Sequence, residues 1–208
     1  MAFAAAPKVF IIDDDVSIRE SIHGLLMSVG LRSECFETAE EFLQSETSDG
    51  PSCLVLDVSL PGISGIEFQQ QLRKQGRKTP IVFVTGHGDI PMSVKAIKSG
   101  AVEFLTKPFG DQDLLDAVRQ ALACDQASRQ EQADLAELEE RFEILTRREQ
   151  EVMELVVSGL LNKEIASELG TREVTVKVHR GRVMHKMQAG SLAELVKMAA
   201  RIQRLRAT

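Results

Sequence analysis

Four short apolar runs of this chain end in polar residues that could together handle a phosphoryl group. Those residues are Asp13, Asp14, Asp57, Thr85 and Lys107. In an open parallel α/β sheet, ligands bind outside the carboxyl ends of the strands. We therefore expect three carboxylates, a hydroxyl and an ammonium to meet at one site. Such a set can bind a divalent cation and hold a phosphoryl group on one of the aspartates.

A sheet that brings these strand ends together is predicted by the hydropathy pattern. Strand-like runs are expected at 8–12, 31–36, 53–56, 81–84 and 102–105, and helical patterns follow them at 16–29, from 39, from 65, at 91–100 and from 113. Strands that alternate with helices indicate parallel βαβ units. Near-continuous apolar strands indicate a sheet covered on both faces. The fold class is therefore α/β, a five-stranded doubly wound parallel sheet.

The segment 125–142 is predicted to be a helical linker. After Asp111 no Gly or Pro occurs until Gly159, so we expect one helix from Asp111 to about Glu140. An a/d seam is formed by Leu135, Leu138, Phe142 and Leu145. We expect this seam to pair with a second copy of the chain. The alternative is a solvated tether whose leucines pack on one domain.

Charge is unevenly distributed along the 208 residues, whose formal net charge is −6. Residues 1–125 hold 11 Lys/Arg and 18 Asp/Glu, a balance of −7, whereas residues 143–208 hold 12 and 8, a balance of +4. This asymmetry suggests an acidic module joined to one that contacts a polyanion. The three cysteines show no metal-ligand spacing. With no apolar run long enough for a membrane span and no signal peptide, we expect a cytoplasmic protein that does not contact a membrane.

The chemistry of the predicted site is metal-assisted phosphoryl transfer. A cation between Asp13, Asp14 and Asp57 would relieve the repulsion between carboxylates, and Mg²⁺ prefers such oxygen ligands. Ionised Asp57 could then attack a phosphoryl group in line, with the metal and Lys107 neutralising charge on its oxygens. Thr85 could donate a hydrogen bond to the phosphoryl group. We therefore expect Mg²⁺ or another divalent cation as cofactor.

Residues 7–124 resemble the receiver domain of bacterial two-component response regulators. The matching segments are Ile12–Asp15, Leu56–Gly62 with Gly65, Thr85–Asp89 and Phe104–Phe109. The resemblance implies a flavodoxin-like fold in which Asp57 accepts phosphate from a sensor histidine kinase. It implies that Asp13, Asp14 and Asp57, with the main-chain carbonyl of Ser59, bind Mg²⁺, that Lys107 contacts the phosphoryl group, and that a cis bond precedes Pro108.

Further roles follow from the same resemblance. Phe104 falls at the aromatic switch position, with ordinary strand packing as the alternative, and Ser59 and His87 fall at positions that tune the phosphate lifetime. The helix from Pro91 and the strand from Val102 would form the surface that pairs two receivers. The candidate dimerisation residues are Pro91, Val94, Lys95, Lys98 and Val102.

The last part of the chain, 143–208, is predicted to be an all-α domain of four helices. Gly159 and Gly170 separate short amphipathic segments, and two helices around the Gly170–Thr171 turn fit a helix-turn-helix. The segments Leu145–Glu149, Gly159–Ala166, Thr175–His179 and Lys186–Met187 resemble the LuxR-type helix-turn-helix of FixJ/NarL-type response regulators.

The third helix of this domain is suited to the major groove of DNA. Arg or Lys there can reach guanine or phosphate. We place Val174, Val178 and Met184 on its core face, and Gly181 could permit close approach to the DNA backbone. A solvated face is the alternative for its cations. The candidate DNA-binding residues are Thr171, Thr175, Lys177, Val178, Arg180 and Arg182.

These expectations combine into a phosphorylation-activated transcriptional regulator with receiver 1–124, linker 125–142 and DNA-binding domain 143–208. Its expected partners are a cognate sensor histidine kinase, double-stranded promoter DNA, a second copy of the chain after phosphorylation, and RNA polymerase. The helix 192–202 could pair on DNA. It would not be an enzyme beyond Mg²⁺-dependent self-phosphorylation and self-dephosphorylation at Asp57.

Three alternatives are weighed against this hypothesis. An aspartate-dependent phosphohydrolase would need a substrate cap and a second Asp two residues beyond the nucleophile, where this chain has Ser59. A phosphate-independent DNA binder would use the receiver only to dimerise, which an intact five-residue site disfavours. An RNA-binding output is disfavoured because the turn motif resembles a reader of duplex DNA.

Overall fold

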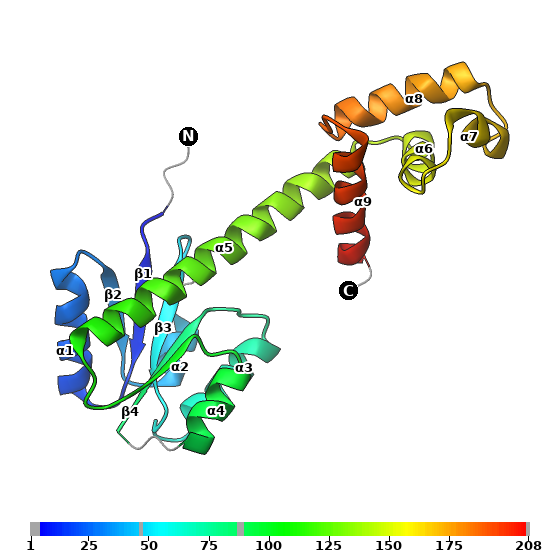
Figure 1. Cartoon of the computed structure of the whole chain (residues 1–208). Helices are drawn as coiled ribbons and strands as arrows, with labels where there is room; N and C mark the ends of the chain where they lie inside the picture. The colour runs from blue at the N-terminus through cyan, green and yellow to red at the C-terminus, as the bar shows by residue number, and fades with distance from the viewer. Residues whose placement is uncertain (1–4, 46–47, 87–89, 207–208) are drawn as a thin grey trace. The chain divides into compact units, whose positions relative to one another are not determined.

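The computed structural model describes residues 5–45, 48–86 and 90–206. The chain forms two compact units, Met1–Arg129 and Gln130–Thr208. The first unit contains the strands β1 (Lys8–Ile12), β2 (Arg32–Phe36), β3 (Ser52–Asp57), β4 (Ile81–Thr85) and β5 (Glu103–Thr106). Its helices are α1 (Val16–Ser28), α2 (Ala39–Gln44), α3 (Gly65–Lys74), α4 (Ile90–Lys98) and the first part of α5 (Asp111–Glu143) (Figure 1).

The five strands form one parallel sheet in the order β2-β1-β3-β4-β5. The register pairs Ile12 with Leu56 across β1 and β3, and Asp57 with Val84 across β3 and β4. Because every pair is parallel, the carboxyl ends of the strands meet at one edge. The predicted fold class, a five-stranded parallel α/β sheet, is confirmed.

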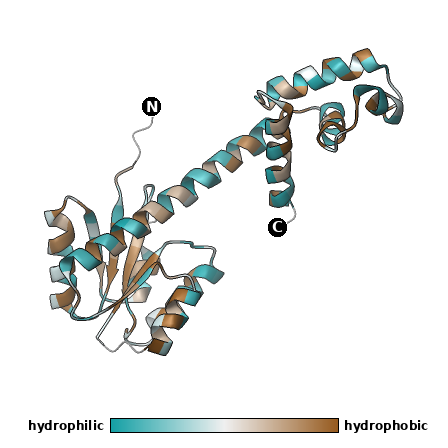
Figure 2. Ribbon diagram, viewed as in Figure 1, coloured by the Kyte–Doolittle hydropathy of each residue, from teal (hydrophilic) through white to brown (hydrophobic). Residues whose placement is uncertain are grey.

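Two hydrophobic layers cover the sheet, because alternate strand residues face opposite sides. One layer joins Phe10, Leu54 and Phe83 of the strands to the helices α2, α3 and α4. The other joins Ile11 and Val55 to α1 and α5. Figure 2 shows the central strands in the brown of hydrophobic residues. This two-sided burial is the reason these strands have nearly continuous apolar sequences.

Helix α5 is continuous over 33 residues, which confirms the predicted long helix. Near its middle, Asp125 is buried and accepts a hydrogen bond from the Ser52 main-chain N–H at 2.8 Å. Arg129 donates to Asp125 at 2.6 Å and to the carbonyl of Ser48 at 3.1 Å. These bonds fasten α5 to the first unit as far as Arg129.

Most residues of the predicted a/d seam pack into the core of the second unit. Leu138, Phe142 and Leu145 are buried with Met153 and the rest of that unit's core, whereas Leu135 is partly exposed. The alternative in which these side chains pack on one domain is therefore what the structure has. The helices that follow supply enough apolar surface to cover three of the four seam residues. The seam is therefore not a continuous exposed apolar stripe.

The second unit consists of helices around one core. They are α6 (Arg147–Val157), α7 (Asn162–Glu168), α8 (Glu173–Lys186) and α9 (Leu192–Arg206). Thr146 and Glu149 form the predicted capping box at the start of α6. Buried Glu149 also accepts a hydrogen bond from Lys186 of α8 at 2.6 Å. In the part of the chain that the structure describes, no helix has the length and apolar character required to span a membrane.

Candidate functional site

Three carboxylates meet at the carboxyl edge of the sheet. Asp13 and Asp14 follow β1, Asp57 ends β3, and one oxygen from each lies within 4.8 Å of the others. Asp13 and Asp57 are buried, while Asp14 is exposed. The predicted convergence of these aspartates is therefore present, with one carboxylate open to solvent.

The side chain of Lys107 links two of these carboxylates. Its Nζ lies 2.5 Å from Oδ2 of Asp13 and 3.1 Å from Oδ2 of Asp57. Burial raises the pKa of Asp13, and Lys107 only partly opposes that effect. Burial would lower the pKa of Lys107, but the hydrogen bonds and charges of Asp13 and Asp57 outweigh it and hold that pKa above its ordinary value. The ammonium therefore stays charged at neutral pH.

The turn after Asp57 is held by main-chain contacts. The N–H of Ser59 donates to Oδ1 of Asp57 at 3.1 Å, and the N–H of Gly65 donates to the carbonyl of Val58 at 2.9 Å. A β-carbon at Gly65 would collide with the main-chain oxygen of Asp57. Only glycine allows the start of α3 to approach the turn this closely.

One neighbour of the acidic cluster was missed by sequence reasoning. Arg19 of α1 donates from Nη1 to the main-chain oxygen of Asp13 at 2.6 Å. The N–H of Asp15 also donates to Oδ1 of Asp13 at 3.0 Å. No sequence motif marks Arg19 as part of the site. It lies within helix α1, and its partner is a main-chain oxygen, which every residue type carries. These contacts fix the carbonyl and carboxylate of Asp13 independently of Lys107.

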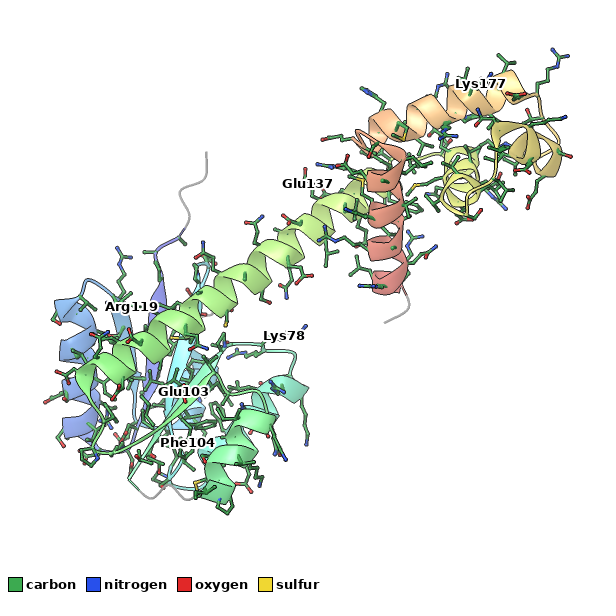
Figure 3. The ribbon with its side chains drawn as sticks, in the orientation of Figure 1. Lys78, Glu103, Phe104, Arg119, Glu137 and Lys177 are labelled. Atoms are coloured by element: carbon green, nitrogen blue, oxygen red, sulfur yellow. The ribbon has the colours of Figure 1, made fainter. Side chains whose placement is uncertain are left out.

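Thr85 ends β4, Lys107 directly follows β5, and Phe104 lies within β5. Thr85 is fully buried, and its carbonyl accepts the N–H of Lys107 at 2.8 Å. The Lys107–Pro108 bond is cis, as the resemblance implied. Phe104, labelled in Figure 3, is half-buried with its ring centroid 6.2 Å from that of Phe83. His87 lies outside the described residues.

The donor set fits a divalent cation. Three carboxylates supply only oxygen ligands, which hard cations such as Mg²⁺ require. Asp14 contributes an exposed carboxylate, and the Ser59 main chain follows directly after the Asp57 turn. Among the residues that the structure describes, two buried carboxylates share a single ammonium, so the cluster keeps negative charge that a cation would neutralise.

The candidate dimerisation residues lie mainly on the outer face of α4. Pro91, Val94, Lys95 and Lys98 are exposed, and Val102 is half-buried. The same helix also exposes Ile90, at 79%, and Ile97, at 45%. The helix therefore presents an apolar stripe next to lysines.

In the second unit, α7 and α8 form the predicted helix-turn-helix. The N–H of Thr171 donates to the carbonyl of Ala166 at 2.9 Å and closes the turn. Lys177 is exposed on the N-terminal half of α8 (Figure 3), 3.3 Å from Glu173. Arg180 donates to Oδ1 of Asn162 at 3.2 Å. Thr171 and Thr175 are half-buried, and Arg182 is exposed.

The predicted core face of α8 is wrong in two positions. Val174 is 65% exposed and Val178 is 49% exposed. The core is instead formed by Val176, Val183 and Met187, whose spacings of seven and four residues fit one helical face, while Met184 is partly buried beside them. Val174 and Val178 therefore share the outer face with Lys177.

A second arginine, to which sequence reasoning gave no individual role, supports the helix-turn-helix. Arg148 of α6 donates from Nη2 to the carbonyl of Leu169, the C-cap residue of α7, at 2.5 Å. Nη1 of the same guanidinium lies 3.0 Å from Oε2 of Glu151. Cations are favourable at a helix C-terminus, where carbonyls lack intrahelical partners. This contact ties the first helix of the motif to α6.

Comparison with protein families places both units. Residues 9–119 match the model of the response regulator receiver domain, and residues 143–199 match that of the bacterial regulatory proteins of the luxR family. The chain therefore belongs to the response regulators, with a receiver domain followed by a LuxR-type DNA-binding domain. Members of this class are phosphorylation-responsive transcriptional regulators. Their receivers bind Mg²⁺ at an acidic pocket and imply a histidine kinase partner.

Individual relatives cover nearly the whole chain. Nodulation protein W of Bradyrhizobium diazoefficiens is 53% identical over 92% of this chain and 84% of that protein. The response regulator protein TodT of Pseudomonas putida is 45% identical over 95% of this chain and 87% of that protein. Among solved structures, the response regulator StyR is similar with a TM-score of 0.83 and 50% identity, over 95% of this chain and 100% of that one.

Proposed function

We propose that Asp57 is the phosphoacceptor of a transcriptional regulator that a sensor histidine kinase switches on. The observation that carries this proposal is the position of Lys107, whose ammonium contacts Asp13 and Asp57 together. A cation at that point is placed to neutralise a phosphoryl group attached to Asp57. Membership in the response regulators supports the same role for the site.

The transfer itself needs an ionised carboxylate and charge neutralisation. An oxygen of Asp57 forms the new bond to phosphorus while the bond from phosphorus to the kinase histidine breaks. The ring nitrogen keeps the electron pair and takes up a proton. Lys107 neutralises the phosphoryl oxygens, and Asp13, Asp14, Asp57 and the carbonyl of Ser59 would hold Mg²⁺. When bound, the metal supplies Lewis-acid stabilisation of those oxygens.

The response to phosphorylation runs through β4 and β5. A phosphoryl group adds charge and three acceptor oxygens, to which Thr85 and Lys107 respond. Thr85 ends β4, which precedes α4, and Lys107 directly follows β5; Phe104 lies on β5 beside Phe83. We infer that movement of this surface exposes a dimer face including Pro91, Val94, Lys95, Lys98 and Val102. Ser59 and His87 would tune the lifetime of the phosphorylated state.

The output is binding to promoter DNA as a dimer. Lys177, Val178 and Arg182 lie on the exposed side of α8, where base and phosphate contacts in the major groove are available to them. Thr171 and Thr175 lie next to the turn, whereas Arg180 bonds to Asn162 at the start of α7. All three are candidates for phosphate contacts. Joining two DNA-binding domains through paired receivers raises the effective concentration of the second domain at its half-site. RNA polymerase is the proposed downstream partner.

The test replaces Asp57 by Asn in the full chain. The parent and the variant are treated with acetyl phosphate and Mg²⁺, and dimerisation is measured by analytical ultracentrifugation alongside binding to promoter fragments. After treatment, the parent is expected to dimerise and to bind promoter DNA more tightly. Asp57→Asn is expected to show no change in dimerisation or in DNA binding. Asp116→Asn, an exposed substitution on α5, is the matched control. A variant that responds as fully as the parent refutes the proposal.

A further inference from the structure

Arg19 connects the start of α1 to the loop that carries the acidic cluster. It lies one turn after Asp15, the N-cap residue of α1, and its Nη1 donates to the main-chain oxygen of Asp13 at 2.6 Å. Side chains of a helix point back toward its N-terminus, so a residue of α1 can reach a carbonyl six positions earlier in the chain. The bond fastens the beginning of the helix to the end of β1.

The residue between these contacts is Asp14. Arg19 binds the carbonyl of the peptide group that precedes Asp14. The N–H of the peptide group that follows Asp14 belongs to Asp15, and it donates to Oδ1 of Asp13 at 3.0 Å. Because peptide groups are planar, holding both of them leaves the φ and ψ angles of Asp14 little freedom. The direction in which its side chain leaves the backbone is thereby fixed.

The carboxylate of Asp14 depends on this backbone support. It is exposed, and it forms no hydrogen bond or ion pair with the residues that the structure describes. The other two carboxylates of the cluster, those of Asp13 and Asp57, are both held by Lys107. Groups that orient metal ligands from outside the ligand set typically change metal affinity about 10–100-fold. Arg19 is such a group, because it reaches Asp14 only through the main chain.

The charge of Arg19 does not explain its position. A guanidinium bonded next to the acidic cluster repels a divalent cation, and a helix N-terminus is partially positive, so a cation there does not stabilise the helix. No ion pair between Arg19 and a carboxylate is found in the described part of the chain. What the side chain contributes is therefore geometric, the orientation of one peptide group.

We propose that Arg19 is a positioning residue of the metal site. It orients the peptide group between Asp13 and Asp14 and so keeps the exposed carboxylate of Asp14 beside the other two. This role rests on the Mg²⁺ site of the proposed function and adds to it a residue outside the ligand set. Removing Arg19 then has two effects of opposite sign on Mg²⁺ affinity. Loss of the positioning contact weakens binding, whereas loss of a nearby positive charge alone would strengthen it.

The experiment measures Mg²⁺ binding to the full chain by calorimetry, without a phosphodonor. Arg19→Met removes the donor and the charge at similar length, and it is expected to raise the Kd for Mg²⁺ about tenfold. Arg19→Lys keeps a cationic donor on a shorter side chain, so its Kd should rise only about threefold. Arg32→Met is the matched control, because Arg32 is exposed and begins β2 at the opposite edge of the sheet. It should bind Mg²⁺ like the parent.

A second measurement follows the peptide group itself. In chelating buffer, the ¹⁵N–¹H signal of the Asp14 amide should shift in Arg19→Met and stay in place in Arg32→Met. The same spectra show whether each variant is folded. Should Arg19→Met not fold, the milder Arg19→Lys variant decides the question through its expected threefold loss of affinity.

Mg²⁺ affinity in Arg19→Met equal to or higher than that of the parent would refute the positioning role and leave phosphorylation of Asp57 untouched. An unchanged Kd in Arg19→Lys together with an unfolded Arg19→Met would refute it as well, as would lost affinity with an unmoved Asp14 signal. A loss as large in Arg32→Met would refute the assignment to Arg19. A parent that binds no Mg²⁺ would remove the metal site of the proposed function, and the role of Arg19 with it.

Discussion

The Nζ of Lys107 lies 2.5 Å from Oδ2 of Asp13, although 94 positions separate the two residues in the chain. The contact exists because parallel pairing brings the ends of β1 and β5 to one edge of the sheet. It joins a carboxylate whose pKa is raised by burial to an ammonium whose pKa is held high by two carboxylates. The stability of the receiver and the phosphoryl chemistry proposed for it therefore involve the same pair.

Replacing Lys107 by Gln should destabilise the receiver in a pH-dependent way. Without the ammonium, the pKa of Asp13 rises further above its ordinary value of 3.8. A carboxyl with a raised folded-state pKa stabilises the fold fully below its unfolded pKa, and this contribution is lost as pH rises through the folded pKa. We expect the free energy of unfolding of the variant to be about 1–3 kcal/mol lower than that of the parent at pH 7, with a smaller difference near pH 4.

Urea unfolding of the first unit in chelating buffer, at several pH values, measures this deficit. Lys74→Gln is the control, since Lys74 is an exposed cation of α3. If the difference in free energy of unfolding between the parent and Lys107→Gln is constant from pH 4 to pH 7, the ammonium does not affect the pKa of Asp13.

Replacing Gly65 by Ala should disturb the turn that positions Asp57. The added β-carbon meets the main-chain oxygen of Asp57, and backbone cannot move aside as a flexible side chain can. Overpacking of this kind costs about 1–3 kcal/mol. We expect lower stability together with slower phosphorylation by acetyl phosphate, because the Ser59 N–H that binds Asp57 belongs to the same turn.

The matched control for Gly65→Ala is Gly24→Ala in α1, where a β-carbon would have no neighbour within 4 Å in the described part of the chain. That substitution should stabilise the fold by about 0.5–1 kcal/mol, because Ala loses less conformational freedom than Gly in a helix. Thermal unfolding distinguishes the two. Equal effects at both positions would mean that the close approach at Gly65 has no cost.

Replacing Glu149 by Gln tests the buried pair in the second unit. Burial would raise the pKa of Glu149, but the hydrogen bond from Lys186 and those from Thr146 outweigh it, so that pKa lies below its ordinary value of 4.5. A lowered folded-state pKa gives stability that is present above the unfolded pKa and lost as pH falls through the folded value. The variant should lose about 1–3 kcal/mol at pH 7.

The difference between parent and Glu149→Gln should therefore shrink as pH falls below about 4.5. Chemical unfolding followed by circular dichroism measures it, and Glu154→Gln, an exposed substitution on the same helix, is the control. Gln can keep the capping-box hydrogen bond, so the change isolates the charge. A loss that is the same at pH 3 and pH 7 would contradict the role of Lys186.

The sequence predicted the sheet and the convergence at its edge for a simple reason. Each polar residue follows an apolar run, and parallel pairing leaves only one place for the strand ends to meet. Contacts through long side chains could not be predicted in this way. Arg19 bonds to the carbonyl of Asp13, and Arg129 reaches the carbonyl of Ser48, 81 positions away. A flexible guanidinium has many possible acceptors, and only the folded backbone selects one.

The face of α8 was mispredicted for a different reason. Valine recurs at every second position from 174 to 178, so a short window fits more than one helical face. Only the wider spacing to Val183 and Met187 assigns Val176 to the core and leaves Val174 and Val178 outside. The exposed valines then belong to the surface proposed to contact DNA, where an apolar side chain can meet a thymine methyl group.

Replacing Gly181 of α8 by Ala should change helix stability and DNA binding in opposite directions. Gly181 is exposed in mid-helix, and a β-carbon there would have no neighbour within 4 Å among the described residues. Gly181→Ala should therefore stabilise the second unit by about 1 kcal/mol. If the glycine serves close approach to the DNA backbone, the same variant should bind promoter DNA more weakly despite its greater stability, as measured by thermal unfolding and fluorescence anisotropy. Gain of stability with unchanged affinity would remove Gly181 from the proposed interface, because the added methyl group would then have met no DNA.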